Sequence, residues 1–240
     1  MDFARLQGMN REALLLEYYH AMLAPLGPSA WWPGETPFEI ALGAILTQNT
    51  AWANVEKAMR NLRESELLDP VSLFRLSDAE LADLIRPAGA FRVKAARVRN
   101  FLHFLRKACG LDMDRLHTQT VEKLRPALLE VSGIGPETAD SILLYALGLP
   151  SFVVDAYTRR ILSRHGLVPE DIGYDELRDF FMDALPADSV LYNEYHALIV
   201  RTGKGWCAKR EGKCPQCPLC ALLDGSSPLT CVGKSIIPHP

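Results

Sequence analysis

The sequence predicts an all-α protein with two lobes, and three observations support that prediction. Apolar residues recur at helical spacing through most of the chain, strand-like alternation is nearly absent, and helix-starting residues precede several of the periodic segments. The chain has 240 residues, of which 48% are hydrophobic, so it is long and apolar enough to bury two small cores.

The helices can be followed in order along the chain. Residues 38–46 and 177–185 place apolar side chains three and four apart, as on the buried face of a helix. Ser77 followed by Glu80 is the capping-box pattern that starts a helix. Residues 120–131 form a further amphipathic run, and residues 225–240 are expected to be a poorly structured tail. Glycines mark the ends of other segments: Gly89, Gly110 and Gly148.

The charge of the chain excludes a protein coated with positive charge. Its formal net charge is −3, so binding to phosphates requires a local basic patch. No membrane-spanning apolar run or secretory leader pattern is present, which favours a cytosolic protein, associated with the nucleoid if it binds DNA. Two sets of residues could form the patch or simply a solvated face: Arg92, Lys94, Arg97 and Arg99, and then Arg201, Lys204, Lys209, Arg210 and Lys213, opposed only by Glu211.

A glycine-containing turn between two helices is a candidate phosphate site. In the segment LLEVSGIGPETAD (residues 128–140), Gly133 and Gly135 can adopt backbone angles closed to other residues, so that amide groups gather near an anion. Pro136 suits the first turn of the following helix, whose N-terminus also favours negative charge. An ordinary turn between helices is the alternative for a glycine pair taken alone.

A single carboxylate follows at the start of another predicted helix. The segment FVVDAYTRR (residues 152–160) brings Asp155 to the end of an apolar run. A carboxylate beside a sugar can stabilise the positive charge that builds up when a glycosidic bond breaks, and it can orient or deprotonate water. Asp155 can also serve simply as the N-cap of its helix.

Together these two segments resemble the helix-hairpin-helix DNA glycosylases of the endonuclease III superfamily, in which a hairpin of the form LxxVxGIGxxTA precedes a VD pair. The resemblance extends over about residues 38–220. It implies a six-helix barrel domain at residues 38–149 and an iron–sulfur helical domain formed by residues 1–37 and 150–240. It also implies that Asp155 is catalytic and that Gly133, Gly135 and Thr138 bind DNA.

The chain departs from bifunctional members of this superfamily at Glu137. Those members have a lysine there, whose amine attacks the sugar and forms a Schiff base. A glutamate cannot do so, which favours hydrolysis by water without strand cleavage. The amine of another lysine could substitute, namely Lys94, Lys123 or Lys204, although none of them stands at the position of the family's lysine.

Two tryptophan-containing segments resemble the 3-methyladenine glycosylase branch of the superfamily. The first is Trp31, Trp32 and Pro33, and the second runs from Gln48 to Trp52. The hairpin, including Glu137, also matches that branch. A ring-methylated purine is cationic and is attracted to aromatic faces. The resemblance therefore implies that Trp31, Trp32, Pro33 and Trp52, with Glu137, form a base pocket, while Gln48 enters the gap left by the flipped base. Core packing is the alternative for the tryptophans and a surface amide the alternative for Gln48.

Cysteines gather near the C-terminus, with Cys109 standing apart as an expected buried thiol. The spacing C-x6-C-x2-C resembles the start of the superfamily's iron–sulfur loop, but the family's fourth position falls on Leu223 here. A four-cysteine zinc site and, less consistent with the cytosol, disulfides are the alternatives. The predicted [4Fe-4S] ligands are Cys207, Cys214, Cys217 and Cys220, with Cys231 as the contender for the fourth.

These features predict a monomeric base-excision glycosylase that binds double-stranded DNA containing a damaged base. The expected reaction is hydrolysis of the N-glycosidic bond of alkylated purines such as 3-methyladenine. Lys209 and Arg210, in the cysteine-rich segment, are expected to contact phosphates. Two alternatives stay open: a bifunctional endonuclease III-like glycosylase and lyase acting on oxidised pyrimidines, and a catalytically silent DNA-binding iron–sulfur protein.

Overall fold

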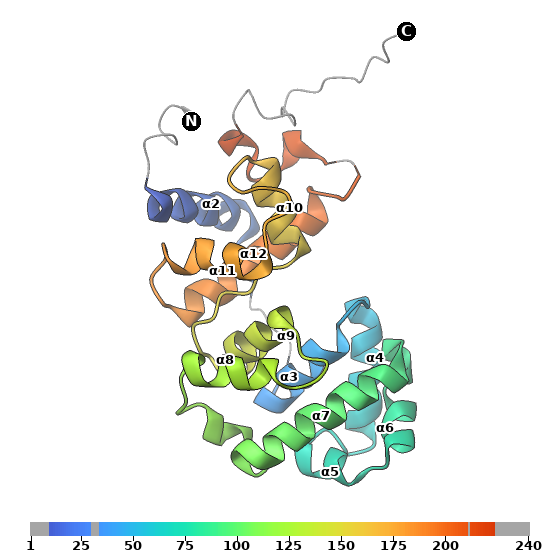
Figure 1. The fold of residues 1–240 in the computed structure, drawn as a ribbon. Helices are drawn as coiled ribbons and strands as arrows, with labels where there is room; N and C mark the ends of the chain where they lie inside the picture. Colours follow the sequence, from blue (N-terminus) through green and yellow to red (C-terminus); the bar gives the residue numbers. More distant parts are fainter. Residues whose placement is uncertain (1–9, 30–33, 211, 224–240) are drawn as a thin grey trace. The chain divides into compact units, whose positions relative to one another are not determined.

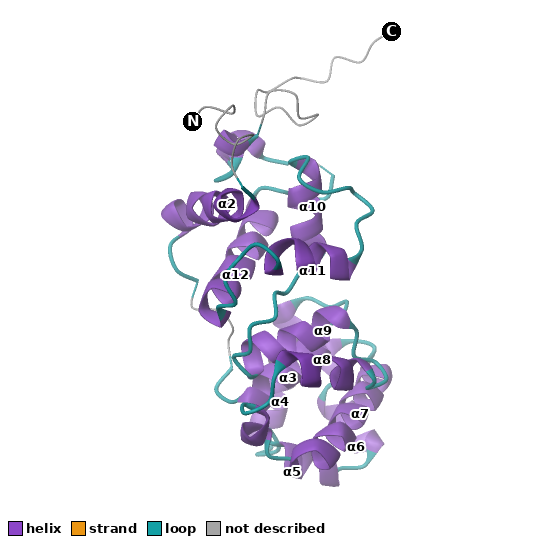
Figure 2. Ribbon diagram, turned by 60° about the vertical axis from the view of Figure 1, so that its left-hand side comes forward, coloured by secondary structure: helices purple, strands orange, loops and turns teal. Residues whose placement is uncertain are grey.

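The computed structural model describes residues 10–29, 34–210 and 212–223, and these residues form helices and loops without a β-strand (Figure 2). The all-α prediction is therefore confirmed. The chain divides into two compact units (Figure 1): a terminal unit, made of Met1–Trp31 and Phe152–Pro240, and a central unit, Trp32–Ser151. None of the described helices is long and apolar enough to span a membrane.

The central unit packs its helices around a continuous apolar core. Every residue of α3 from Phe38 to Leu46 except Ile40 is buried, and the inward face of α7 contributes Phe101 and Leu102. A π-helical turn, η3, directly follows α9 and continues that helix. The helices are α3 (Pro37–Leu46), α4 (Trp52–Glu64), α5 (Pro70–Arg75), α6 (Asp78–Leu84), α7 (Phe91–Cys109), α8 (Val121–Leu129) and α9 (Pro136–Ser141), with short helical turns η1 (Arg86–Ala88), η2 (Met113–Leu116) and η3 (Ile142–Ala146).

The terminal unit is built on an aromatic core. Phe152 stacks on Phe181 with ring centroids 4.1 Å apart, and Tyr192 and Tyr195 pack edge-on against Phe152. Arg201 fastens the end of the N-terminal helix by donating to the carbonyl oxygen of Gly27 at 2.8 Å. The elements are α2 (Arg11–Leu26), α10 (Ala156–Arg164), α11 (Tyr174–Met182), α12 (Ser189–Gly205), η4 (Cys214–Gln216) and η5 (Cys220–Leu222).

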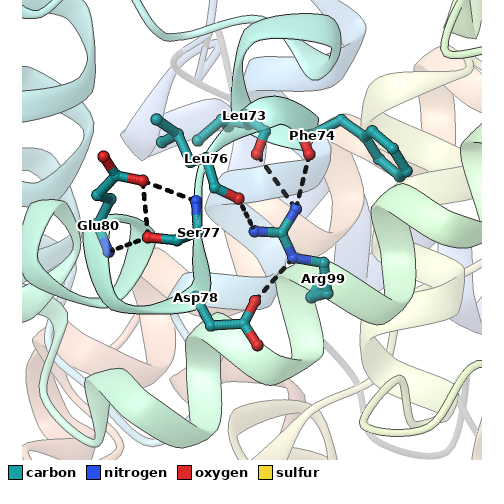
Figure 3. Close-up of polar contacts among 7 residues, drawn as sticks. All are labelled: Leu73, Phe74, Leu76, Ser77, Asp78, Glu80 and Arg99. Carbon is teal, nitrogen blue, oxygen red and sulfur yellow. Dashed lines mark hydrogen bonds and ion pairs between the residues drawn. The ribbon is translucent and has the colours of Figure 1, made fainter.

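The capping box predicted at Ser77 is present and starts α6 (Figure 3). The backbone N–H of Ser77 donates to Glu80 Oε2 at 2.8 Å, and the backbone N–H of Glu80 donates to the Ser77 hydroxyl at 3.3 Å. Beside it, Arg99 of α7 donates to the carbonyl oxygens of Phe74 and Leu76 and pairs with Asp78 (Figure 3). Arg99 thus satisfies carbonyl groups that the end of α5 leaves without helical partners.

Candidate functional site

The predicted hairpin is present in the central unit as α8, a turn and α9, and α9 begins at Pro136 as expected. Gly133 has a φ of 95°, in the region that glycine adopts most easily. Gly135 has a φ of −91°, which any residue adopts, so the expectation of a special backbone angle is wrong for Gly135. A Cβ added to Gly135 would meet no heavy atom within 4 Å. The missing side chain therefore leaves the first turn of α9 open.

The turn is held by a hydrogen-bonded group of side chains from α7, from α9 and from the segment that follows α3. A Cβ added to Gly133 would lie 2.3 Å from Cγ of Arg97, so Arg97 packs directly on the glycine. The guanidinium of Arg97 donates to Oε1 of Gln48. The amide nitrogen of Gln48 donates to the carbonyl oxygen of Gly133 at 3.1 Å and to the Thr138 hydroxyl at 2.8 Å. Gln48 and the buried Thr138 thus stabilise the hairpin, and their contact with DNA stays a prediction.

A buried ion pair joins the two hairpin helices from within. Asp140 is fully buried, and its two oxygens accept from Nε and Nη2 of Arg125 on α8 at 2.9 and 3.2 Å. The Ser151 hydroxyl donates to the same carboxylate at 2.5 Å. Because bidentate geometry satisfies both oxygens, this pair fixes the angle between the two helices. Asp140 stands within the hairpin motif, but no local pattern in the sequence identifies Arg125 as its partner.

The predicted base-pocket residues are only partly described. Trp52 is the first residue of α4, is half-buried against the central core, and donates from Nε1 to Glu56 at 2.9 Å. Glu137 is exposed in the first turn of α9. The other three predicted members lie outside the described residues: Trp31, Trp32 and Pro33.

Asp155 is the N-cap of α10 in the terminal unit. Its Oδ1 accepts three hydrogen bonds, from the backbone N–H groups of Tyr157 and Thr158 at 2.8 Å each and from the Thr158 hydroxyl at 3.0 Å. Its Oδ2 lies 3.7 Å from Nε2 of His196, and the Asp155 side chain is 13% exposed. The expected cap is therefore present, and it occupies one carboxylate oxygen far more fully than the other.

The surroundings of Asp155 keep its carboxyl ionised. Burial by itself would raise the pKa of Asp155, but His196 and the hydrogen bonds from Thr158 outweigh that effect, so the pKa lies below its ordinary value of 3.8. His196, on α12, was not among the residues predicted from the sequence. A lone histidine in an apolar helix carries no local signal, and it comes near Asp155 only through the packing of α12 on α10.

The predicted cysteine ligands gather in the terminal unit. Three of them line one small pocket: Cys207, Cys214 and Cys217. The pKa of Cys217 is raised to about 11, chiefly by burial and to a smaller extent by the nearby Cys207, Cys214 and Cys220. Cys220 therefore lies within electrostatic range of the others. Within the described ranges, no three side chains of His, Cys, Asp or Glu are arranged to hold a single metal ion. Cys231 lies outside those ranges.

The segment between Cys207 and Cys214 is held by arginines from α10. Arg164 donates to the carbonyl oxygens of Ala208 and Lys209 at 2.8 and 3.0 Å, and to the Cys207 sulfur at 3.3 Å. Arg160 donates to the carbonyl oxygen of Cys207 at 2.8 Å. These bonds occupy backbone groups, while the side chains of Lys209 and Arg210 are exposed. The apolar Cys109, by contrast, is buried in the central unit as expected.

Three residues of the first basic set are engaged within the central unit, while Arg92 is exposed. Lys94 is buried and donates from Nζ to the carbonyl oxygens of Leu46 and Ala88 at 2.8 and 2.7 Å, so it can neither reach a phosphate nor attack a sugar. Arg97 and Arg99 are engaged with Gln48 and Asp78. The reason is that these side chains satisfy backbone carbonyls and polar groups within the central unit.

Comparison with known proteins agrees with this geometry. The family model described as HhH-GPD superfamily base excision DNA repair protein matches residues 42–187. A protein of Methanocaldococcus jannaschii whose assigned name is that of a DNA repair glycosylase is 44% identical, over 88% of this chain and 96% of that protein. Endonuclease III of Sulfolobus acidocaldarius is 27% identical, over 75% of this chain and 78% of the relative.

Solved structures show the same fold. The crystal structure of Helicobacter pylori 3-methyladenine DNA glycosylase, bound to 1,N6-ethenoadenine, matches with a TM-score of 0.70 and 28% identity, over 82% of this chain and 98% of the other. A non-covalent endonuclease III–DNA complex matches with a TM-score of 0.72 at 23% identity, over 90% and 96%. The resemblance inferred from the hairpin is thereby confirmed: the chain belongs to the HhH-GPD superfamily of base excision DNA repair proteins and is a DNA glycosylase.

Proposed function

We propose that this glycosylase hydrolyses the N-glycosidic bond of alkylated purines and that Asp155 is its catalytic carboxylate. The observation that carries the proposal is that the two carboxylate oxygens of Asp155 have different surroundings. Oδ1 accepts three hydrogen bonds that fix its position, while Oδ2 makes a longer approach to His196 and the side chain keeps 13% of its surface exposed. A fixed, ionised oxygen is suited to a substrate that develops positive charge.

The chemistry follows from that placement. As the bond between the base and C1′ breaks, positive charge spreads over the sugar ring, and Oδ2 of Asp155 stabilises it. The same oxygen orients a water molecule and accepts its proton as the water attacks C1′. The base leaves with the electron pair of the broken bond. A purine alkylated at a ring nitrogen leaves easily because it is already cationic.

We propose that the reaction is monofunctional, leaving an abasic site. Glu137 occupies the position at which bifunctional relatives have their nucleophilic lysine, and it is exposed in the first turn of α9. The amine of Lys94 is buried and donates to two carbonyl groups. Neither residue provides the free amine that a Schiff base requires.

Alkylated purines are the proposed substrate class on two grounds. The Helicobacter pylori relative, named a 3-methyladenine DNA glycosylase, was solved with 1,N6-ethenoadenine. Trp52, at the start of α4, is only partly buried, and we propose that its ring stacks on a cationic base. We propose that Trp31, Trp32, Pro33 and Glu137 complete the base pocket.

The proposed DNA contacts come from both units. The first turn of α9 offers backbone N–H groups beside Gly133 and Gly135, and Gly135 has open space where a side chain would stand. Lys209 and Arg210 are exposed, so they can neutralise phosphates without losing an internal partner. We propose that Gln48 gives up its hydrogen bonds to Gly133 and Thr138 and enters the gap in the duplex. Thr138, whose hydroxyl would then be released, is also proposed to contact DNA.

We propose that Cys207, Cys214, Cys217 and Cys220 hold a [4Fe-4S] cluster. Four thiols lie within electrostatic range in one segment, yet no three of the described side chains converge as the ligands of a single ion do. A [4Fe-4S] cluster takes one cysteine thiolate for each of its four irons, which matches the number of these cysteines. The cluster would order the segment that carries Lys209 and Arg210. Analysis of iron, zinc and acid-labile sulfide in purified protein tests this, and zinc without sulfide would refute it.

The decisive experiment compares two damaged substrates. The protein is incubated separately with methylated duplex DNA and with thymine-glycol duplex DNA, and the released bases are identified. We expect 3-methyladenine or another alkylated purine from the first and nothing from the second, with no protein–DNA adduct after borohydride treatment. Release of thymine glycol alone, with a trapped adduct, would establish the bifunctional alternative. Binding without release of either base would establish a silent DNA-binding protein.

A further inference from the structure

We propose that His196 is a positioning residue for Asp155: it holds the carboxylate ionised and directs Oδ2, the oxygen left over from helix capping, toward the substrate. This inference rests on the proposed function, because it assigns a partner to the proposed catalytic group. The imidazole Nε2 lies 3.7 Å from Oδ2, and the two side chains are 7% and 13% exposed. At that distance the imidazole attracts the carboxylate without making a short hydrogen bond that would block it.

The packing of α12 on α10 places His196 next to Asp155. Gly203 of α12 lies so close to α10 that an added Cβ would stand 2.4 Å from Cδ1 of Tyr157. His196 precedes Gly203 by seven residues, so it lies two turns earlier on the same face of α12. The close contact at Gly203 therefore sets the height at which the imidazole meets Asp155.

Two other charged groups of α10, Arg160 and Arg164, donate hydrogen bonds to the segment that begins at Cys207. Arg160 donates to the carbonyl oxygen of Cys207 at 2.8 Å, and its guanidinium lies over the Tyr157 ring. Arg159 is exposed. On α12, Tyr195 precedes His196 and donates its hydroxyl to the carbonyl oxygen of Leu15 at 2.7 Å. Among the described groups, the attraction that lowers the pKa of Asp155, against the opposing effect of burial, comes from His196, with help from the bonds of Thr158.

The test compares His196→Leu and His196→Gln with the wild type. The dependence of base release on pH is measured in single-turnover reactions, after subtraction of spontaneous release. Leucine removes the attraction between the imidazole and the Asp155 carboxylate. The acidic limb of the pH profile of base release should therefore move to higher pH by about one pH unit. KM should change less than the chemical step. Glutamine keeps an N–H donor near the Nε2 position but cannot be protonated, so it should shift the limb by a smaller amount.

Tyr195→Phe is the matched control. It removes a buried hydrogen bond from the adjacent position of α12 without touching Asp155. It should lower stability to a similar degree and leave the acidic limb where it is. A limb that does not move in either folded His196 variant, or one that moves equally in Tyr195→Phe, would overturn the proposal.

A second measurement separates this inference from the proposed function. The Asp155 carboxyl is titrated directly by carbon-13 NMR, with Asp155→Asn used to assign its signal. If the wild type releases no damaged base, the proposed function fails, but the pKa of Asp155 should still rise in His196→Gln and His196→Leu. An unchanged carboxyl pKa in both would overturn the positioning role even in an active enzyme.

Discussion

The starts of α9 and α10 solve the same problem in opposite ways. Each helix leaves backbone N–H groups in its first turn without helical partners. At α10, Asp155 satisfies two of them with Oδ1. At α9 the N-cap is Gly135, no side chain caps the helix, and there is open space where a Cβ would be.

The difference indicates what each helix start is prepared to meet. The uncapped start of α9 can accept an anion from outside the chain, which suits a DNA phosphate. The capped start of α10 is already satisfied, so its remaining carboxylate oxygen is available for a positive charge. We propose that the start of α9 binds the DNA backbone and that the start of α10 acts on the sugar.

The largest effect on activity is expected when a substitution removes the charge of Asp155 but keeps its N-cap hydrogen bonds. Asparagine caps helices about as well as aspartate, so Asp155→Asn should retain the fold while losing the charge. Base release should fall about a thousandfold, or ~4 kcal/mol in the activation free energy. Single-turnover release and thermal unfolding measure the two effects. Retention of more than a tenth of the wild-type rate would contradict the catalytic assignment.

A smaller effect on stability is expected when the hairpin loses its internal ion pair. Arg125→Ala leaves Asp140 buried without its bidentate partner, which should lower the free energy of unfolding by about 3 kcal/mol. Denaturant unfolding measures the change. Arg115→Ala is the control, because its pair with Asp112 is exposed and should contribute less than about 1 kcal/mol. Equal losses in the free energy of unfolding would mean that the buried pair of Arg125 and Asp140 contributes no more than the exposed pair.

The two hairpin glycines should respond differently to alanine. Gly133→Ala should cost about 2 kcal/mol of stability, because its φ is 95° and the new Cβ meets Arg97. Gly135→Ala should leave stability nearly unchanged, since its backbone and surroundings accept a methyl group. It should nevertheless weaken DNA binding about tenfold by crowding the start of α9. Fluorescence anisotropy measures DNA binding and thermal unfolding measures stability. Equal effects of the two substitutions on both quantities would contradict this prediction.

The smallest effect is expected in the acid stability of the two units. The folded pKa of Asp155 lies below 3.8, so its ionised form adds stability above that pH, and this contribution disappears as the pH falls through the folded value. The start of α9 has a glycine cap and contributes no such dependence. Asp155→Asn should therefore flatten the fall in stability below pH 4, measured by urea unfolding at stepped pH. A slope identical to that of the wild type would show that Asp155 is not the group responsible.

Local patterns in the sequence determined the helices and their starts. The capping box at Ser77, the first-turn position of Pro136 and the N-cap role of Asp155 each depend on residues no more than three apart. Such interactions need only residues that are close in the sequence, so they could be predicted without the fold. The hairpin motif likewise identified the family.

Only the tertiary structure decided which side chains support the site. His196 reaches Asp155 from a helix some forty residues later, and Arg97 meets Gln48 and Gly133 across separations of 49 and 36 residues along the sequence. Lys94, one of the basic residues considered for DNA, is buried by its bonds to Leu46 and Ala88. The physical reason is that a helical period shows which face of each helix is apolar. It does not show which turn of one helix lies against which turn of another, because that register is set by packing.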